Sequence, residues 1–141
     1  MTYASGVEAV NMTLKTATTV AGAGYILTND STNNTVDLVA ATEVGLFISA
    51  DESSRDAAGD LITAAGATVS AYPLGGVMLV AAKASDVFTT GITVYCGAGG
   101  LATVTAGSDK KLGLYVGEGQ TATAVAGETL VLVATAGAAI A

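Results

Sequence analysis

The sequence predicts an all-β protein with little helix, organised as a small β-barrel or a sandwich-like domain. Three observations favour this class. Short runs of β-branched and aromatic residues recur through the 141 residues, with Gly, Asn, Asp and Ser between them. The apolar content, 51% of the residues, is mostly Ala and Val, and charged residues make up only 12%. The 18 Gly supply turn positions between so many short runs.

The expected strands can be followed along the chain from residue 10 onward. They are residues 10–19, 24–28, 35–39, 44–48, 76–80, 92–95, 102–105, 112–116 and 129–133. Residues 35–39 show the alternation of a half-buried strand, and the polar turn 29–34 precedes them. Only residues 51–65 are expected to allow a helix, which Asp51 would cap and Gly59 would interrupt.

A shift of 68 positions aligns the sequence with itself without gaps. Residues 45–48 then fall on 113–116, and Lys15 falls on Lys83. Residue class is also preserved at Val20 with Phe88, Ile26 with Val94, and Ile62 with Leu130. A tandem duplication would produce these matches, and so would any small β fold of this composition. Both interpretations stay open at this point.

If the duplication is real, the chain divides into three parts. Residues 1–20 form an N-terminal arm or a first strand, and residues 20–72 form the first β half. Residues 75–141 form the second β half. Pro73 and Gly75 mark the seam, because both residues can end one structural unit and begin the next.

Several classes of chemistry are excluded by composition. The chain has no His and a single cysteine, Cys96, so it has no Ser-His-Asp triad, imidazole metal site or intrachain disulfide. We therefore expect no cofactor and no metal, and we do not expect an enzyme. Five Lys and Arg against twelve Asp and Glu give a net charge of −7. This charge argues against nucleic acid and anionic membranes as partners.

The remaining candidate sites are weak when judged by their spacing. Residues 97–100 are rich in glycine but lack the Lys-Ser or Lys-Thr pair of a phosphate loop, so a hairpin turn is favoured. Residues 30–37 lack the central Gly and the terminal Glu of a calcium loop. Cys96 has no basic neighbour in sequence, which favours a structural thiol over a reactive one.

The densest acidic group lies between residues 51 and 60. It consists of Asp51, Glu52, Asp56 and Asp60. No nucleophile stands nearby, so a solvated acidic surface is favoured over a general acid–base pair. Lys110 and Lys111 form the strongest basic spot on this acidic chain, and we consider them candidates for contact with a partner.

No targeting or membrane segment is expected. The first residues lack the basic and apolar regions of a signal peptide, and the longest apolar run, residues 71–82, is too short to span a bilayer. Synthesis and folding in a cytoplasm is therefore expected.

The second half resembles capsid decoration proteins of tailed bacteriophages, also called head-stabilising or cement proteins. The resemblance is carried by residues 76–83, 91–95, 100–104, 111–116 and 126–131. They follow the layout of a strand, Gly-x-x-Val-Tyr, a small-residue turn, x-Ala-Thr-x-Thr, Leu-Gly-x-x-Val-Gly and Ala-Gly-acidic-x-apolar. The first half matches this layout only through the suspected repeat.

The resemblance implies a structural virion protein without catalytic residues. Such a protein binds the outer surface of the capsid, bridges major capsid subunits and stabilises the expanded head, often as a homotrimer. It would be made in the host cytoplasm and end on the capsid exterior. Residues 1–20 would add to a capsid strand by β-augmentation. Residues 29–34 and 51–60 do not fit the layout.

Two alternatives remain at the level of sequence. One is another phage structural subunit, either a major capsid protein or a tail-tube component, which would share this composition. The other is a bacterial surface β domain, which would need an export signal.

Overall fold

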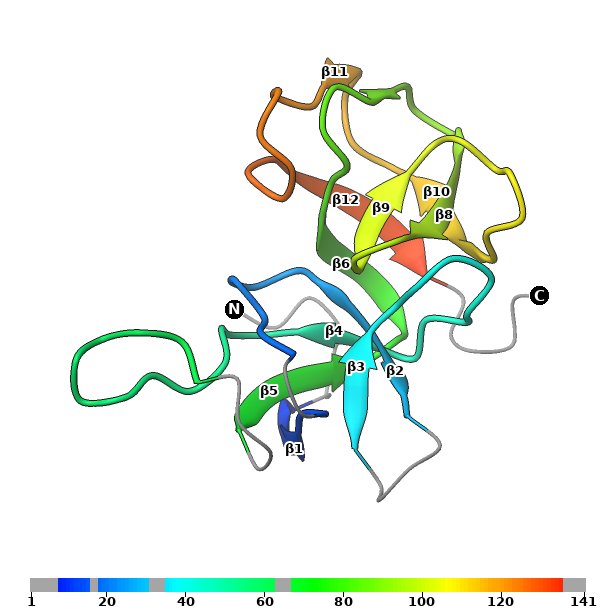
Figure 1. The fold of residues 1–141 in the computed structure, drawn as a ribbon. Helices are drawn as coiled ribbons and strands as arrows, with labels where there is room; N and C mark the ends of the chain where they lie inside the picture. Colours follow the sequence, from blue (N-terminus) through cyan, green and yellow to red (C-terminus); the bar gives the residue numbers. More distant parts are fainter. Residues whose placement is uncertain (1–7, 16–17, 31–34, 63–66, 136–141) are drawn as a thin grey trace.

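The chain folds as an all-β protein, as the sequence predicts (Figure 1). The computed structural model describes residues 8–15, 18–30, 35–62 and 67–135. Within these ranges there is no helix. The strands are β1 (Val10–Thr13), β2 (Ile26–Asn29), β3 (Val36–Leu38), β4 (Phe47–Ser49), β5 (Thr68–Pro73), β6 (Gly76–Ala81), β7 (Val87–Phe88), β8 (Thr93–Gly97), β9 (Leu101–Thr103), β10 (Lys111–Tyr115), β11 (Gln120–Thr121) and β12 (Leu130–Thr135).

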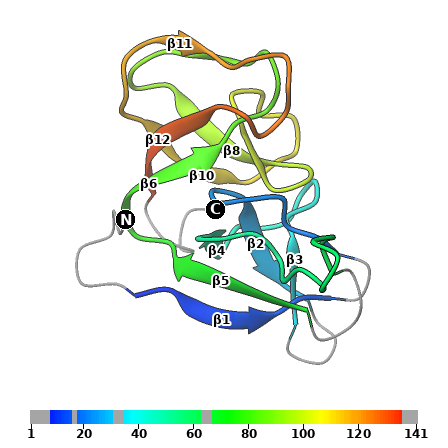
Figure 2. The same ribbon diagram turned by 90° about the vertical axis from the view of Figure 1, so that its left-hand side faces the viewer.

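Two five-stranded antiparallel sheets form the body of the molecule. The first has the order β1-β5-β4-β2-β3 and the second has the order β6-β12-β10-β8-β9. A small third sheet joins β11 to β7. In Figure 2 the first sheet occupies one end of the molecule and the second sheet with β11 occupies the other. The chain crosses from one sheet to the other between Pro73 and Gly76.

The two sheets have the same strand order when strands are matched in sequence. β1, β2, β3, β4 and β5 correspond to β6, β8, β9, β10 and β12. In each sheet the residue that follows the first strand forms a parallel bridge to the strand at the opposite edge. The bridges are Leu14 with Val36 and Ala82 with Ala102. Both sheets therefore curl so that their outer strands meet, as in a small barrel.

The correspondence between the sheets needs gaps. Leu14 and Ala82 are 68 residues apart, but their bridge partners Val36 and Ala102 are only 66 apart. The amide of Leu14 donates to Ala67 and that of Ala82 to Thr129, positions that are 62 apart. A gapless shift of 68 is therefore wrong beyond the first strand. A tandem duplication with a shorter second copy would give this pattern.

A hydrogen-bonded pair of one threonine and one aspartate occurs at matching positions in both halves. The aspartate lies on the edge strand in the first half, and the threonine lies there in the second. In the first half the Thr18 hydroxyl donates to Asp37 Oδ1 at 2.8 Å. In the second half the Thr103 hydroxyl donates to Asp86 Oδ2 at 2.6 Å. Each carboxylate also accepts a backbone amide, that of Leu38 in the first pair and of Val104 in the second. The pairs tie the segment after the first strand to the edge strand of each sheet.

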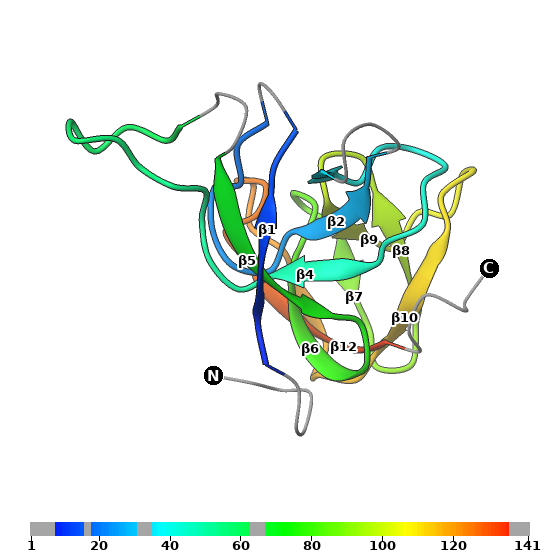
Figure 3. The same cartoon turned by 90° about the horizontal axis from the view of Figure 1, so that it is seen from below.

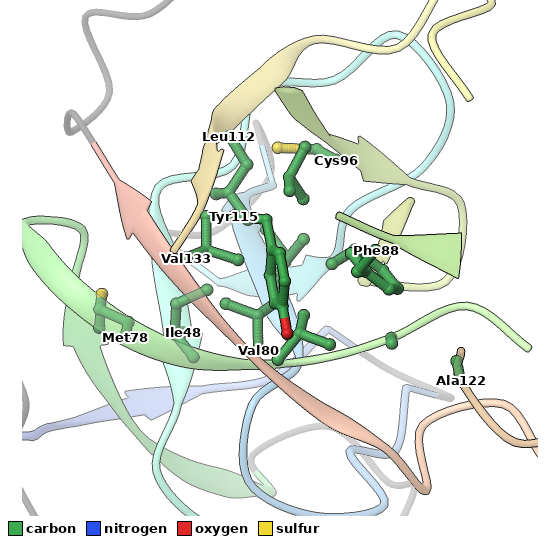
Figure 4. Packing of buried hydrophobic residues seen from close by; sticks show 14 of the residues in the cluster. Ile48, Met78, Val80, Phe88, Cys96, Leu112, Tyr115, Ala122 and Val133 are labelled. Atoms are coloured by element: carbon green, nitrogen blue, oxygen red, sulfur yellow. The ribbon is translucent and has the colours of Figure 1, made fainter. Parts of the chain in front are cut away.

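The buried core is shared between the two halves. One cluster surrounds Tyr115 and Phe88 in the second half, and it includes Ile26, Val39 and Ile48 from the first half (Figure 4). A second cluster is built from the first half alone, from Leu14, Val20, Leu27, Val36, Ala67, Val69 and Ala71. Backbone hydrogen bonds also cross the boundary, from Ile26 to Gly100 and from Ala81 to Gly24.

The expected helix in residues 51–65 is wrong for its described part, residues 51–62. Asp56 Oδ1 accepts the amides of Ala58 and Asp60, which fixes a turn in place of a helix start. Gly59 has a φ of +88°, in the left-handed region that favours glycine. The segment forms a loop that projects from the first sheet (Figure 3).

Some sequence-based predictions fall on residues outside the described ranges. Of the predicted N-terminal arm 1–20, residues 1–7 and 16–17 lie outside, and so do residues 31–34 of the polar turn and the end of the second half from 136. The described part of the arm contains β1, which pairs with β5.

Candidate interaction surface

Lys110 ends the turn between β9 and β10, Lys111 is the first residue of β10, and both are exposed. Lys111 begins β10 and stands opposite Tyr95 of β8. Among the described residues, ion pairs are formed by Lys15 with Asp37 and by Arg55 with Glu52. The two candidate lysines therefore have no acidic partner within the described part of the molecule.

The acidic stretch 51–60 does not converge on a site. Arg55 binds the Glu52 carboxylate through Nε at 2.6 Å and Nη2 at 2.8 Å. The Arg55 hydrogen bond lowers the pKa of Glu52, whose side chain is partly exposed. Asp56 is used within its own turn. Across the described ranges, no three acidic or thiol groups are arranged to hold a metal ion.

Cys96 is buried in the cluster around Tyr115 and Phe88, where it is 1% exposed (Figure 4). Burial raises the pKa of its thiol above the ordinary value of 9.0, and the Asp109 carboxylate adds to this shift. A hydrogen bond with the backbone of Gly45 acts in the opposite direction. These surroundings suit a structural thiol and not a nucleophile.

We expect Cys96 to react slowly with a thiol reagent at pH 8 and rapidly after unfolding in urea. A raised pKa in the folded state means that the neutral thiol stabilises the fold fully below pH 9.0, and that this contribution is lost as the pH rises through the folded-state value. Urea unfolding of wild type and Cys96→Ala at pH 8 and pH 10 measures how much of the free energy of unfolding each protein loses over this interval. Wild type should lose more stability than the variant over that interval, and equal losses would contradict the assignment.

We compared the chain with known protein families and with curated proteins. No family model matches, and no curated protein is significantly similar. No helix long and apolar enough to cross a membrane occurs in the described ranges. The surfaces of the molecule must therefore be interpreted from their own chemistry.

The outer surface of the second sheet is apolar where β6, β12 and β10 lie side by side. Val77 stands beside Ala134 and Ala134 beside Leu114, while Leu79 stands beside Leu132. We call six residues the outer apolar face: Val77, Leu79, Leu114, Val116, Leu130 and Leu132. Four of them are between 37% and 48% exposed. A hollow of about 340 Å³ beside Leu79, Leu130 and Leu132 extends this face.

The equivalent surface of the first sheet is polar where β1 pairs with β5, but apolar at β4, where Ile48 stands beside Tyr72 in the place of Leu114 beside Ala134. Asn11 and Ser70 take the places of Leu79 and Leu132, and the Ser70 hydroxyl donates to Asn11 Oδ1 at 2.7 Å. The next outward pair on that sheet is a pair of threonines. The same strand order therefore accepts polar residues in the places of Leu79 and Leu132, whereas the place of Leu114 is taken by Ile48, which is buried against the second half.

The outer apolar face was not identified from the sequence, although β12 carries a signal for it. Residues 130–133 are apolar at every position, so both faces of this strand are apolar. Such a run predicts a strand covered on both sides. In the described structure Val131 and Val133 enter the core, while Leu130 and Leu132 point away from it.

The edge of β1 is a second surface with unused bonding groups. The amide of Leu14 points to β5, where it donates to Ala67, and that of Lys15 points the other way, to Val36. Because the direction alternates along a strand, the backbone groups of Asn11 and Thr13 point away from β5. Those of Asn11 have no backbone partner among the described residues, whereas the chain from Thr13 onward meets β3 through the bridge of Leu14 to Val36; Figure 2 shows β1 at the outside of the molecule.

Proposed function

We propose that this chain is a structural virion protein that binds the outer surface of a bacteriophage capsid and stabilises the expanded head. Its partner would be the major capsid protein. The number of copies is proposed as three, from the resemblance of the second half to decoration proteins. The segments that carry this resemblance contain β6, β8, β9, β10 and the start of β12, which belong to one sheet. They therefore form one structural unit.

The observation that carries the proposal is the open edge of β1. A strand edge with free N–H and C=O groups accepts an extended segment from another protein. Asn11 offers such groups, and the side chains on its side of the sheet, those of Ser70 and Thr13, are short and polar. A strand of a capsid subunit would pair with β1 here. Net charge −7 supports a place outside the shell, away from packaged DNA.

The stabilising effect would follow from linkage. A protein that binds only the expanded lattice stabilises it by about 2.7 kcal/mol per site when its free concentration is a hundred times the dissociation constant. Heads that withstand heating equally well without the protein, or a protein found inside the shell, would contradict the proposal.

We expect Asn11→Pro to weaken binding to expanded capsids by about tenfold, because proline removes the outward amide of the β1 edge. The internal ladder should persist, since this amide does not point to β5. Co-sedimentation of labelled protein with expanded particles measures the affinity.

The matched control is Asn11→Ala, which loses the same side-chain bond to Ser70 but keeps the amide. It should bind like wild type within about threefold. Equal binding of the proline and alanine variants would exclude the β1 edge as the contact.

A further inference from the structure

We propose that the outer apolar face binds a second copy of this chain, with the strands of the two copies antiparallel. This contact does not depend on the capsid proposal. Two copies of one face meet about a two-fold axis, so the contact is also separate from a three-fold association. Three observations carry it.

The first observation is that the face is apolar and exposed, whereas Ile48, which takes the place of Leu114 on the first sheet, is buried against the second half. Leu114 is 48% exposed and Val116 is 44% exposed, on adjacent outward positions of the same strand and its continuation. The equivalent surface of the first sheet shows polar pairs such as Asn11 with Ser70. Contiguous exposed apolar groups on a soluble protein mark sites of association.

The second observation is the distribution of charge at the two ends of the face. Lys110 and Lys111 lie where β10 begins, and Asp109 in the same turn leaves that end with a net charge of +1. Glu118 follows the end of β10 and Glu128 precedes β12, so both lie at the opposite end. Because β10 and β12 are antiparallel, the end of β10 lies beside the start of β12. Glu118 and Glu128 are therefore at the same end of these strands.

The third observation is that Lys110 and Lys111 have no acidic partner within the described residues, whereas Lys15 and Arg55 are paired and Lys83 is also unpaired. An antiparallel second copy brings Glu118 and Glu128 of one copy to Lys110 and Lys111 of the other. The same contact then occurs twice. The apolar residues between the ends meet their own counterparts, so one surface supplies both halves of the interface.

The face of the first sheet provides the control for a direct test. Leu114→Asp places a charge in the centre of the face, and Thr13→Asp places one outside it, on the exposed threonine pair of β1 and β5. Sedimentation across a concentration series gives the dissociation constant of self-association. We expect Leu114→Asp to raise it by about 30-fold or more and Thr13→Asp to leave it within about threefold. Thermal unfolding checks that both variants fold.

Charge reversal tests the orientation of the two copies. One variant carries Lys110→Glu with Lys111→Glu, and the other carries Glu118→Lys with Glu128→Lys. Each should self-associate about tenfold more weakly than wild type, because like charges then face one another. An equimolar mixture of the two variants should form mixed dimers at least as tightly as wild type forms its own dimers, because opposite charges then face one another again.

Three results would overturn the proposal. Wild type could remain monomeric up to about 1 mM, which would leave no contact of useful affinity. Leu114→Asp could self-associate as strongly as wild type. The mixture of charge variants could fail to recover association, which would exclude the antiparallel arrangement. None of these measurements involves capsids, so their failure is distinct from failure of the proposed function.

Discussion

Replacing Phe88 by alanine is expected to destabilise the protein by about 3–5 kcal/mol, a large part of the stability of a domain this size. Phe88 is completely buried, and its ring centre lies 5.4 Å from that of Tyr115. Removing the ring would leave a cavity in the shared core and remove this aromatic contact. The melting temperature should fall by roughly 10 °C or more.

The control for this substitution is the neighbouring residue on the same two-residue strand. Val87 is 54% exposed, so Val87→Ala should change the free energy of unfolding by less than about 0.5 kcal/mol. Urea unfolding followed by circular dichroism measures both variants. A loss below about 1.5 kcal/mol for Phe88→Ala would show that the core can collapse around the missing ring.

The second large effect is expected at Gly113, where alanine should destabilise the fold by about 3 kcal/mol or more. A Cβ at this position would collide with the backbone carbonyl of Ala134 on β12. That backbone is held in register by the pairing of β10 with β12, so it has little freedom to move. Gly113 also follows a register irregularity between β10 and β8, where glycine is common.

Gly22→Ala is the matched control for Gly113→Ala. A Cβ at Gly22 meets nothing within 4 Å, so this variant should be as stable as wild type within about 0.5 kcal/mol. Both variants can be compared by thermal unfolding and by yield of soluble protein. Equal stability of the two variants would mean that β10 and β12 can separate locally at no cost.

The sequence predicts the strands that carry β-branched residues between glycines, and it does not predict the strands that lack this pattern. β2, β8 and β10 fall within or beside the expected runs. β5 is not among the expected strands, although Thr68–Ala71 alternates polar and apolar residues, because these residues are small and the run ends in Pro73 at the expected seam. β7 and β11 have two residues each, too few for a period to be recognised.

The wrong helix has a physical reason that sequence patterns do not resolve. Asp caps a helix by accepting backbone amides, and it closes a loop turn by the same bonds. Asp56 uses its carboxylate in the second way. Gly59 at positive φ closes the turn.

For the candidate surfaces, too, the sequence predicts some features and not others. That Lys110 and Lys111 are charged and lie near glycine is visible in the sequence, and both are exposed. Whether Leu130 or Val131 faces the core depends on strand register and on the layers above each face. These are properties of the assembled sheets, and the apolar run alone is compatible with either direction.

The shared core also determines how the molecule comes apart. Ile26, Val39 and Ile48 belong to the first half of the chain, yet they are buried among residues of the second half. Separation of the halves would bring these three side chains into water together with the partners that cover them. We therefore expect the two halves to unfold together despite two sheets with one repeated topology, so that damage to either half lowers the stability of both.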